Sequence, residues 1–169
     1  MEQRIRDQYH PEILKTALQK FELESAEVTE LRGFENFIFQ VKKGKENLVL
    51  KLVHSIRRTN EQAEGEAEFL QYLKDEGLGV AAALPSPEGN FVETVDASDG
   101  YFCALVYEFA EGGRVAPENF NDALMENMGS LLGKIHTVSR GFQPSKIKRP
   151  DIFEESVPIL DDFIPKDQW

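Results

Sequence analysis

The chain has 169 residues, of which 19 are Lys or Arg and 30 are Asp or Glu, so its formal net charge is −11. A chain of this length buries roughly 70% of the surface that it exposes when unfolded, which is enough for a core of its own. The acidic balance argues against a nucleic-acid partner, because phosphate backbones are bound by clustered Lys and Arg.

Membrane and redox features are also missing from the sequence. No apolar run approaches the roughly 18 residues that span a bilayer, and the charged segment from Met1 to Asp7 is followed by no apolar signal sequence. The single cysteine, Cys103, cannot form an internal disulfide and has no CxxC partner for a zinc ribbon. We therefore expect a cytoplasmic protein that has no membrane partner.

The first sixty residues predict a helix and three strands. Apolar residues at helical spacing follow Pro11, which suits the first turn of a helix; they are Ile13, Leu14, Ala17, Leu18 and Phe21. Alternation then begins at Val28, and strand-like runs follow at 36–41 and 47–53 around a turn at 43–45. The loops are too short for parallel crossovers, so the three strands are predicted to be antiparallel.

The middle of the chain predicts a second helix and a hairpin. Thr59 and Gln62 form a capping-box signature, and apolar residues at helical spacing then continue to Gly77, which predicts a helix over 60–76. Prolines break the chain at 85 and 87, and the runs 90–95 and 101–108 flank a polar turn typical of a hairpin.

A glycine joint and a long helix follow. Gly112 and Gly113 form the joint, and a second helix ending near Ser139 is indicated by an apolar stripe of Phe120, Leu124, Met128, Leu131, Leu132 and Ile135. The expected fold is therefore α+β, a five-stranded antiparallel sheet with a packed helix, followed by helical segments. We expect a sheet-based lobe over 1–110, and over 111–169 a hinge and the first helical part of a second lobe.

Lys51 and Glu66 are the first candidate site residues. A lysine within a largely apolar strand needs an anionic partner or an exposed position for its ammonium group. Glu66 lies 15 residues further on in the middle of the predicted helix, which is how kinases place the ion pair that orients ATP phosphates. From spacing alone, a lysine on the exposed face of an edge strand is the alternative.

Two backbone segments are further candidates. Gly33 to Asn36 lies between the first two strands, where free N–H groups could cover phosphates, although a plain hairpin turn explains one glycine equally well. The run from Tyr107 to Gly113 passes from a strand directly into the glycine joint, which leaves backbone groups able to bind the edge of a planar ring. An ordinary linker between lobes is the alternative there.

Five segments in order carry a resemblance to a known family. LRGFENFIFQV, LVLKL, EGEAEFLQYL, ALVYEFAEGG and MGSLLGKIH resemble the N-terminal part of the aminoglycoside phosphotransferase family, kinase-like enzymes that act on small molecules, over roughly residues 14–137. The resemblance implies that Lys51 contacts ATP phosphates and that Glu66 holds Lys51.

The resemblance also assigns the backbone candidates. Gly33 and Asn36 with their neighbours would form the turn that covers the nucleotide, and the backbone of Glu108 and Ala110 would bind adenine. His136 matches the histidine that ends the family's helix, where a structural role is expected.

The sequence departs from the family pattern after residue 137. The family continues into an HGDxxxxN loop that supplies the catalytic base, and then into an aspartate that holds Mg²⁺; neither motif occurs here. Asp161 and Asp162 lack the flanking histidine, glycine and asparagine. We therefore expect a shortened product that is inactive alone, binds ATP weakly, and contains no catalytic or metal-binding residue, with Mg²⁺ used only by the full-length parent.

The competing hypothesis is a non-catalytic module that binds a nucleotide or a protein partner. The apolar stripe between Leu124 and Ile135 has no evident second lobe to cover it, so it favours self-association, and a homodimer through this helix is predicted.

Overall fold

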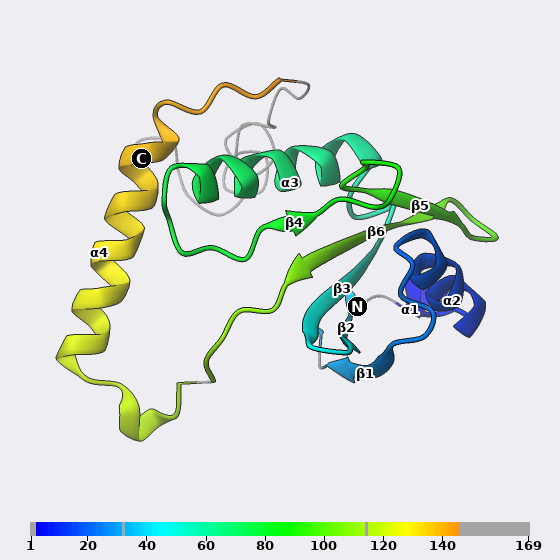
Figure 1. The fold of residues 1–169 in the computed structure, drawn as a ribbon, viewed down its shortest axis with the longest axis horizontal. Helices are drawn as coiled ribbons and strands as arrows, with labels where there is room; N and C mark the ends of the chain where they lie inside the picture. Colours follow the sequence, from blue (N-terminus) through cyan, green and yellow to red (C-terminus); the bar gives the residue numbers. More distant parts are fainter. Residues whose placement is uncertain (1–2, 32, 114, 146–169) are drawn as a thin grey trace, which may run out of the picture.

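The computed structural model describes residues 3–31, 33–113 and 115–145. They form an antiparallel sheet with helices on both of its faces and one long helix beyond it (Figure 1). The strands are β1 (Glu27–Leu31), β2 (Phe37–Lys43), β3 (Glu46–His54), β4 (Ala83–Leu84), β5 (Glu93–Asp96) and β6 (Tyr101–Glu108).

The strand order is β1-β2-β3-β6, and β4 and β5 both pair with the free side of β6. β5 pairs with the first half of β6, and β4 pairs with Tyr107 and Val106 near its end. β3 is therefore an interior strand, flanked by β2 and β6 along most of its length.

Successive side chains of β3 and β6 point to opposite faces of the sheet, so the core is divided into two clusters, one on each face. On one face, α1 (Gln3–Arg6) and α2 (Pro11–Lys20) pack on a cluster that includes Leu50, Leu52 and Phe102. On the other face, α3 (Asn60–Asp75) packs on a cluster that includes Val53, Leu105 and Tyr107. In Figure 1 the short helices α1 and α2 lie at one end of the sheet, and α3 runs along β4 and β6.

Local signals set the ends of the long helices. The Thr59 side chain accepts a hydrogen bond from the Gln62 backbone, and the Gln62 side chain accepts one from the Thr59 backbone, so the predicted capping box is present. The second long helix, α4 (Asp122–Ser139), begins after Asn121, whose side chain accepts a hydrogen bond from the backbone of Leu124.

The predicted fold class is confirmed, with additions to its details. The sheet has six strands, because the two-residue β4 adds to the five expected. A short helix, α1, precedes the predicted one, and β5 begins at Glu93 rather than at residue 90. Such short elements carry too few residues for a recognisable periodicity.

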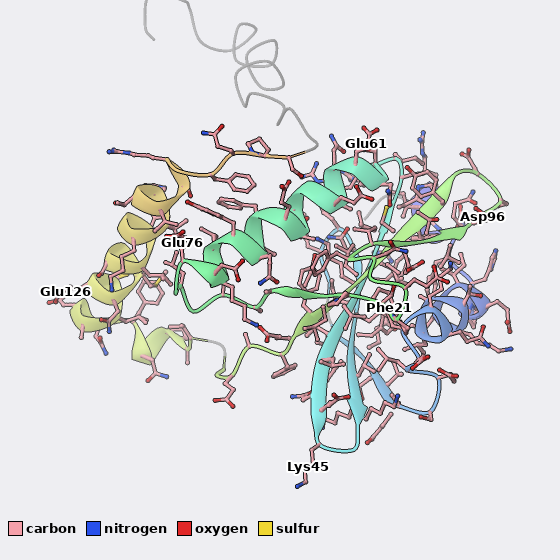
Figure 2. The ribbon with its side chains drawn as sticks, turned by 45° about the horizontal axis from the view of Figure 1, so that its top comes forward. Phe21, Lys45, Glu61, Glu76, Asp96 and Glu126 are labelled. Atoms are coloured by element: carbon pink, nitrogen blue, oxygen red, sulfur yellow. The ribbon has the colours of Figure 1, made fainter. Side chains whose placement is uncertain are left out.

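Helix α4 stands apart from the sheet. In Figures 1 and 2 it lies beyond the end of α3, and none of its residues is buried. Met125, Met128, Leu131 and Leu132 are each between 43% and 53% exposed. No helix among the described residues is both long and apolar enough to cross a membrane.

Candidate functional site

Lys51 lies on the face of β3 that is covered by α3. Its neighbours Leu50 and Leu52 are fully buried on the opposite face, and Lys51 itself is the register partner of Leu105 on β6. The Lys51 side chain is only 16% exposed. Lys51 is therefore not a surface lysine of an edge strand, and its ammonium group is held between the sheet and the helix.

Glu66 supplies the anionic partner from the middle of α3. The distance from Lys51 Nζ to Glu66 Oε1 is 2.6 Å. A charge-assisted contact of this length holds a partly buried ammonium group in one place. The structure thus brings together the two residues that the sequence pattern pairs.

Tyr107 is a third member of this cluster that the sequence analysis did not assign to it. Its hydroxyl donates a hydrogen bond to Glu66 Oε1 at 2.9 Å, and Lys51 Nζ lies 5.8 Å from the centre of its ring. Burial, and then the charge and hydrogen bond of Glu66, raise the pKa of the Tyr107 phenol. It therefore remains a neutral donor at physiological pH.

The turn from Gly33 to Asn36 is tight, and its backbone requires glycine at the first position. A Cβ atom added at Gly33 would lie 2.0 Å from the main-chain oxygen of Asn36, a distance at which atoms clash. Within the turn, the Glu35 carboxylate lies 3.5 Å from the guanidinium of Arg57, which lies in the segment that leads into α3. The turn is thus held near the start of that helix.

The joint after β6 offers a ligand two backbone groups, the carbonyl of Glu108 and the N–H of Ala110. The Glu108 N–H donates to the Ala82 carbonyl at 3.1 Å, so Glu108 can offer a ligand only its own carbonyl oxygen. Ala110 is exposed, and its N–H has no hydrogen-bond partner among residues 3–31, 33–113 and 115–145.

The Glu108 side chain has a separate role in holding the joint. Its Oε1 lies 2.5 Å from Nζ of Lys74 on α3, and its Oε2 accepts a hydrogen bond from the Ala82 N–H at 3.4 Å. The hydrogen bond from Lys74 lowers the pKa of the Glu108 carboxyl group more than its slight burial raises it. The end of β6 is therefore tied to both α3 and the segment before β4.

Comparison with known proteins assigns the family. A family model described as "phosphotransferase enzyme family" matches residues 27–159. The chain belongs to this phosphotransferase family.

A curated relative supports the same assignment. Over 164 residues the chain is 32% identical to the amicoumacin kinase of Bacillus subtilis (strain 168), and the match covers 95% of this chain and 49% of the relative. The chain thus spans about half the length of that kinase.

Solved structures of phosphotransferases share the fold. An amicoumacin kinase solved in complex with AMP-PNP, Ca²⁺ and Ami superimposes with a TM-score of 0.83 at 29% identity, over 99% of this chain and 52% of that one. A microcompartment-associated aminopropanol kinase gives a TM-score of 0.70 at 19% identity, over 85% of this chain and 46% of that one, which shows the fold alone.

The described part of the chain offers three groups that could bind a ligand. The cation of Lys51, the tight turn at Gly33 and the N–H of Ala110 could each contact a ligand. In the residues that the structure covers, no group of three or more His, Cys, Asp or Glu side chains could hold a metal ion. His136 lies in the last turn of α4, and Asp161 and Asp162 lie outside the described residues.

A separate pocket of about 610 Å³ lies on another face of α3, and its lining includes Glu68, Tyr72, Phe91 and Phe142. None of Lys51, Glu66 and Glu108 lines it. We assign the candidate site to the Lys51 cluster rather than to this pocket, because none of the described residues that line the pocket has a cationic side chain to bind an anionic ligand.

Proposed function

We propose that the chain is the N-terminal, nucleotide-binding part of a kinase that transfers the γ-phosphoryl group of ATP to a hydroxyl of a small molecule. The observation that carries the proposal is the Lys51–Glu66 ion pair, at 2.6 Å between an interior strand and α3. A fixed, partly buried cation of this kind is suited to ATP phosphates.

The joint supports adenine as the base. The Glu108 carbonyl is an acceptor and the Ala110 N–H is a donor, and adenine offers an amino group beside a ring nitrogen that match them. Guanine presents a carbonyl beside an N–H, so it would place acceptor against acceptor. We therefore expect ATP to bind in preference to GTP, with Gly33 and Asn36 in the turn over its phosphates.

The remaining parts of the reaction are assigned to the whole protein. The 169-residue sequence contains no HGDxxxxN loop, so we infer that the chain alone transfers no phosphoryl group. When bound, Mg²⁺ would neutralise phosphate charge, and its ligands would come from outside the described residues. The amicoumacin kinase relatives make amicoumacin the first acceptor to test with the whole protein. Because ATP is the proposed phosphoryl donor, we also infer that the protein is cytoplasmic.

The division of the chain at the joint is part of the same proposal. Residues 1–110 form the nucleotide-binding lobe, and residues 111–169 form the hinge and the first part of a helical lobe. We expect weak binding by this chain alone, because the rest of the helical lobe would supply part of the pocket. With Kd near 1 mM, about 5 mM ATP adds about 1 kcal/mol to stability and about 2 to 4 °C to the melting temperature.

Ligand-induced shifts in melting temperature test the site. Lys51→Met removes the cation and is expected to reduce the ATP shift while leaving a smaller adenosine shift intact. Glu66→Gln loosens the orientation of Lys51 without removing its charge, so it should reduce the ATP shift less than Lys51→Met does. Lys15→Met is the matched control, since Lys15 is 62% exposed and its partner Glu12 is 78% exposed.

Two results would refute this site. Equal loss of the ATP and adenosine shifts in Lys51→Met would show that Lys51 does not act on the phosphates, so the assignment of this site would be wrong. An ATP shift that neither Lys51→Met nor Glu66→Gln changes would place the nucleotide elsewhere.

Self-association is a second candidate function, and the exposure of α4 favours it. None of its 18 residues is buried, and large contiguous apolar surfaces are uncommon on monomers. We infer a homodimer through the helix face from Leu124 to Ile135. This function and nucleotide binding are compatible, because they use different surfaces.

A further inference from the structure

We propose that Tyr107 is a positioning residue for the nucleotide phosphates: its hydroxyl orients Glu66, and Glu66 in turn orients the Lys51 ammonium group. The inference deepens the proposed function and rests on it, because it assumes that Lys51 receives phosphate. It concerns a residue whose side chain would not itself contact the phosphates.

The geometry of one carboxylate oxygen carries the argument. Glu66 Oε1 lies 2.6 Å from Lys51 Nζ and accepts the Tyr107 hydroxyl at 2.9 Å. Two donors from different strands, β3 and β6, thus converge on a single atom of α3. Moving the carboxylate away from Tyr107 would also change its contact with Lys51.

The Tyr107 side chain has less conformational freedom than the Glu66 side chain. The Glu66 side chain is 36% exposed and projects from a helix, so its rotamers are limited mainly by its contacts. Tyr107 is 8% exposed and belongs to the cluster between the sheet and α3. An aromatic ring packed in this way is a rigid anchor, and its hydroxyl offers Glu66 one fixed position.

Tyr107 also stands next to the joint. It directly precedes Glu108, whose side chain is held by Lys74 of α3 and whose N–H is held by Ala82. The same short stretch of backbone therefore carries the groups proposed for adenine and the side chain that steadies the phosphate-binding pair. Loss of the hydroxyl should affect the phosphate part of the ligand and leave the adenine part unchanged.

The variant Tyr107→Phe isolates the hydroxyl because it keeps the ring in the core. We would titrate wild type and variant with ATP and with adenosine, and measure Kd by calorimetry or by melting shifts. ATP should bind about 3 to 10 times more weakly to the variant, the size expected from the loss of one hydrogen bond of typical net strength, and adenosine less than about twofold more weakly.

Tyr101→Phe is the matched control. Tyr101 also lies on β6 and its hydroxyl also contacts α3, since it accepts the Asn60 N–H at 3.1 Å. That contact is at the start of the helix and involves neither Lys51 nor Glu66. Loosening of α3 in general would weaken ATP binding in both variants, whereas the positioning role predicts the loss in Tyr107→Phe alone.

A double-mutant cycle tests the route through Glu66. In a Glu66→Gln background, Tyr107→Phe should weaken ATP binding less than about twofold further, because the carboxylate it acts through is gone. Equal effects in both backgrounds, or equal losses of ATP and adenosine, would overturn the positioning role.

The same data separate this inference from the proposed function. ATP binding that depends on Lys51 but is unchanged in Tyr107→Phe would refute the inference alone. Absence of ATP binding to the wild-type chain, or binding indifferent to Lys51→Met, would refute both.

Discussion

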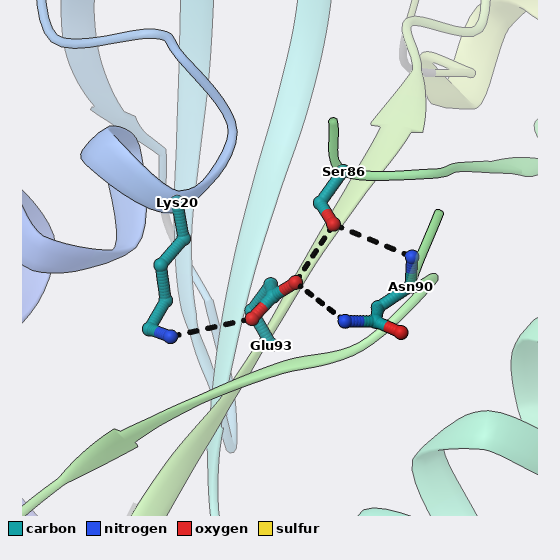
Figure 3. A network of polar contacts seen from close by, with 4 residues as sticks. All are labelled: Lys20, Ser86, Asn90 and Glu93. Carbon is teal, nitrogen blue, oxygen red and sulfur yellow. Dashed lines mark hydrogen bonds and ion pairs between the residues drawn. The ribbon is translucent and has the colours of Figure 1, made fainter. Parts of the chain in front are cut away.

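Lys20 of α2 and Glu93 of β5 are 73 residues apart in the sequence and form an ion pair, with 3.3 Å between Nζ and Oε2. The other Glu93 oxygen accepts hydrogen bonds from the Ser86 hydroxyl at 2.7 Å and from the Asn90 side chain at 3.1 Å (Figure 3). Glu93 is 6% exposed. Its carboxylate therefore joins α2, the turn before β5 and the sheet at a buried point.

This network should make stability depend on pH. Burial alone would raise the pKa of Glu93, but the hydrogen bonds from Ser86, Asn90 and Lys20, with the charge of Lys20, outweigh burial and lower it. Because the folded pKa lies below the unfolded value of about 4.3, the contribution is complete above that value. It is lost as the pH falls through the folded pKa.

Glu93→Gln should lower the free energy of unfolding by about 1 to 3 kcal/mol at neutral pH, with a smaller loss in acid. Urea denaturation of wild type and variant between about pH 3 and pH 7 would measure both. Glu12→Gln is the control, since Glu12 is 78% exposed, and it should change stability by less than about 0.5 kcal/mol. A Glu93→Gln effect that stays constant across this range would contradict the assignment.

The Lys74–Glu108 pair should matter much less for stability, although its 2.5 Å contact is shorter. Its side chains are 40% and 39% exposed, so water and salt screen the charges. Lys74→Met is expected to cost about 0.2 to 1 kcal/mol at low salt and less at high salt. Urea denaturation at low and at high salt concentration would measure this loss of stability. A loss of several kcal/mol would show that the joint depends on this pair for folding.

Gly33→Ala should disturb the turn that we place over the phosphates. The added Cβ would meet the Asn36 oxygen, so the turn must open. We expect a weaker ATP shift and a smaller change for adenosine, measured as melting temperatures. Gly79→Ala is the control because nothing lies within 4 Å of its added Cβ. An unchanged ATP shift in Gly33→Ala would show that the turn does not contact the phosphates.

Replacing apolar residues on α4 should disrupt the homodimer. Leu131→Glu and Leu132→Glu place charges at positions that are 43% and 53% exposed, so they should disfavour association without unfolding the lobe. Sedimentation velocity over a wide concentration range would show a dimer for wild type and monomers for these variants. Ser130→Glu, an exposed neighbour, should remain dimeric. A wild type that stays monomeric at high concentration would refute the homodimer.

Local chemistry in the sequence was sufficient for much of the fold. The capping box at Thr59 and the helical spacing after it predict α3 almost to its last residue. Alternating apolar and polar residues predict the strands, because successive side chains of a strand point to opposite faces of the sheet. The short turns between them predict the antiparallel pairing. The Lys51–Glu66 pair was also within reach, since a lysine in an apolar strand needs an anionic partner or an exposed position, and Glu66 lies in the middle of the next helix, where kinases place the partner.

Only the tertiary structure decided the contacts that depend on register between distant segments. Tyr107 reaches Glu66 because β6 lies beside β3 with Leu105 opposite Lys51, a pairing that no local pattern specifies. The two-residue β4 forms because the end of β6 offers it hydrogen-bonding groups. Glu93 is stabilised by Lys20, which lies 73 residues earlier in the sequence. Periodicity shows which face of an element is buried, whereas packing decides which partner it meets.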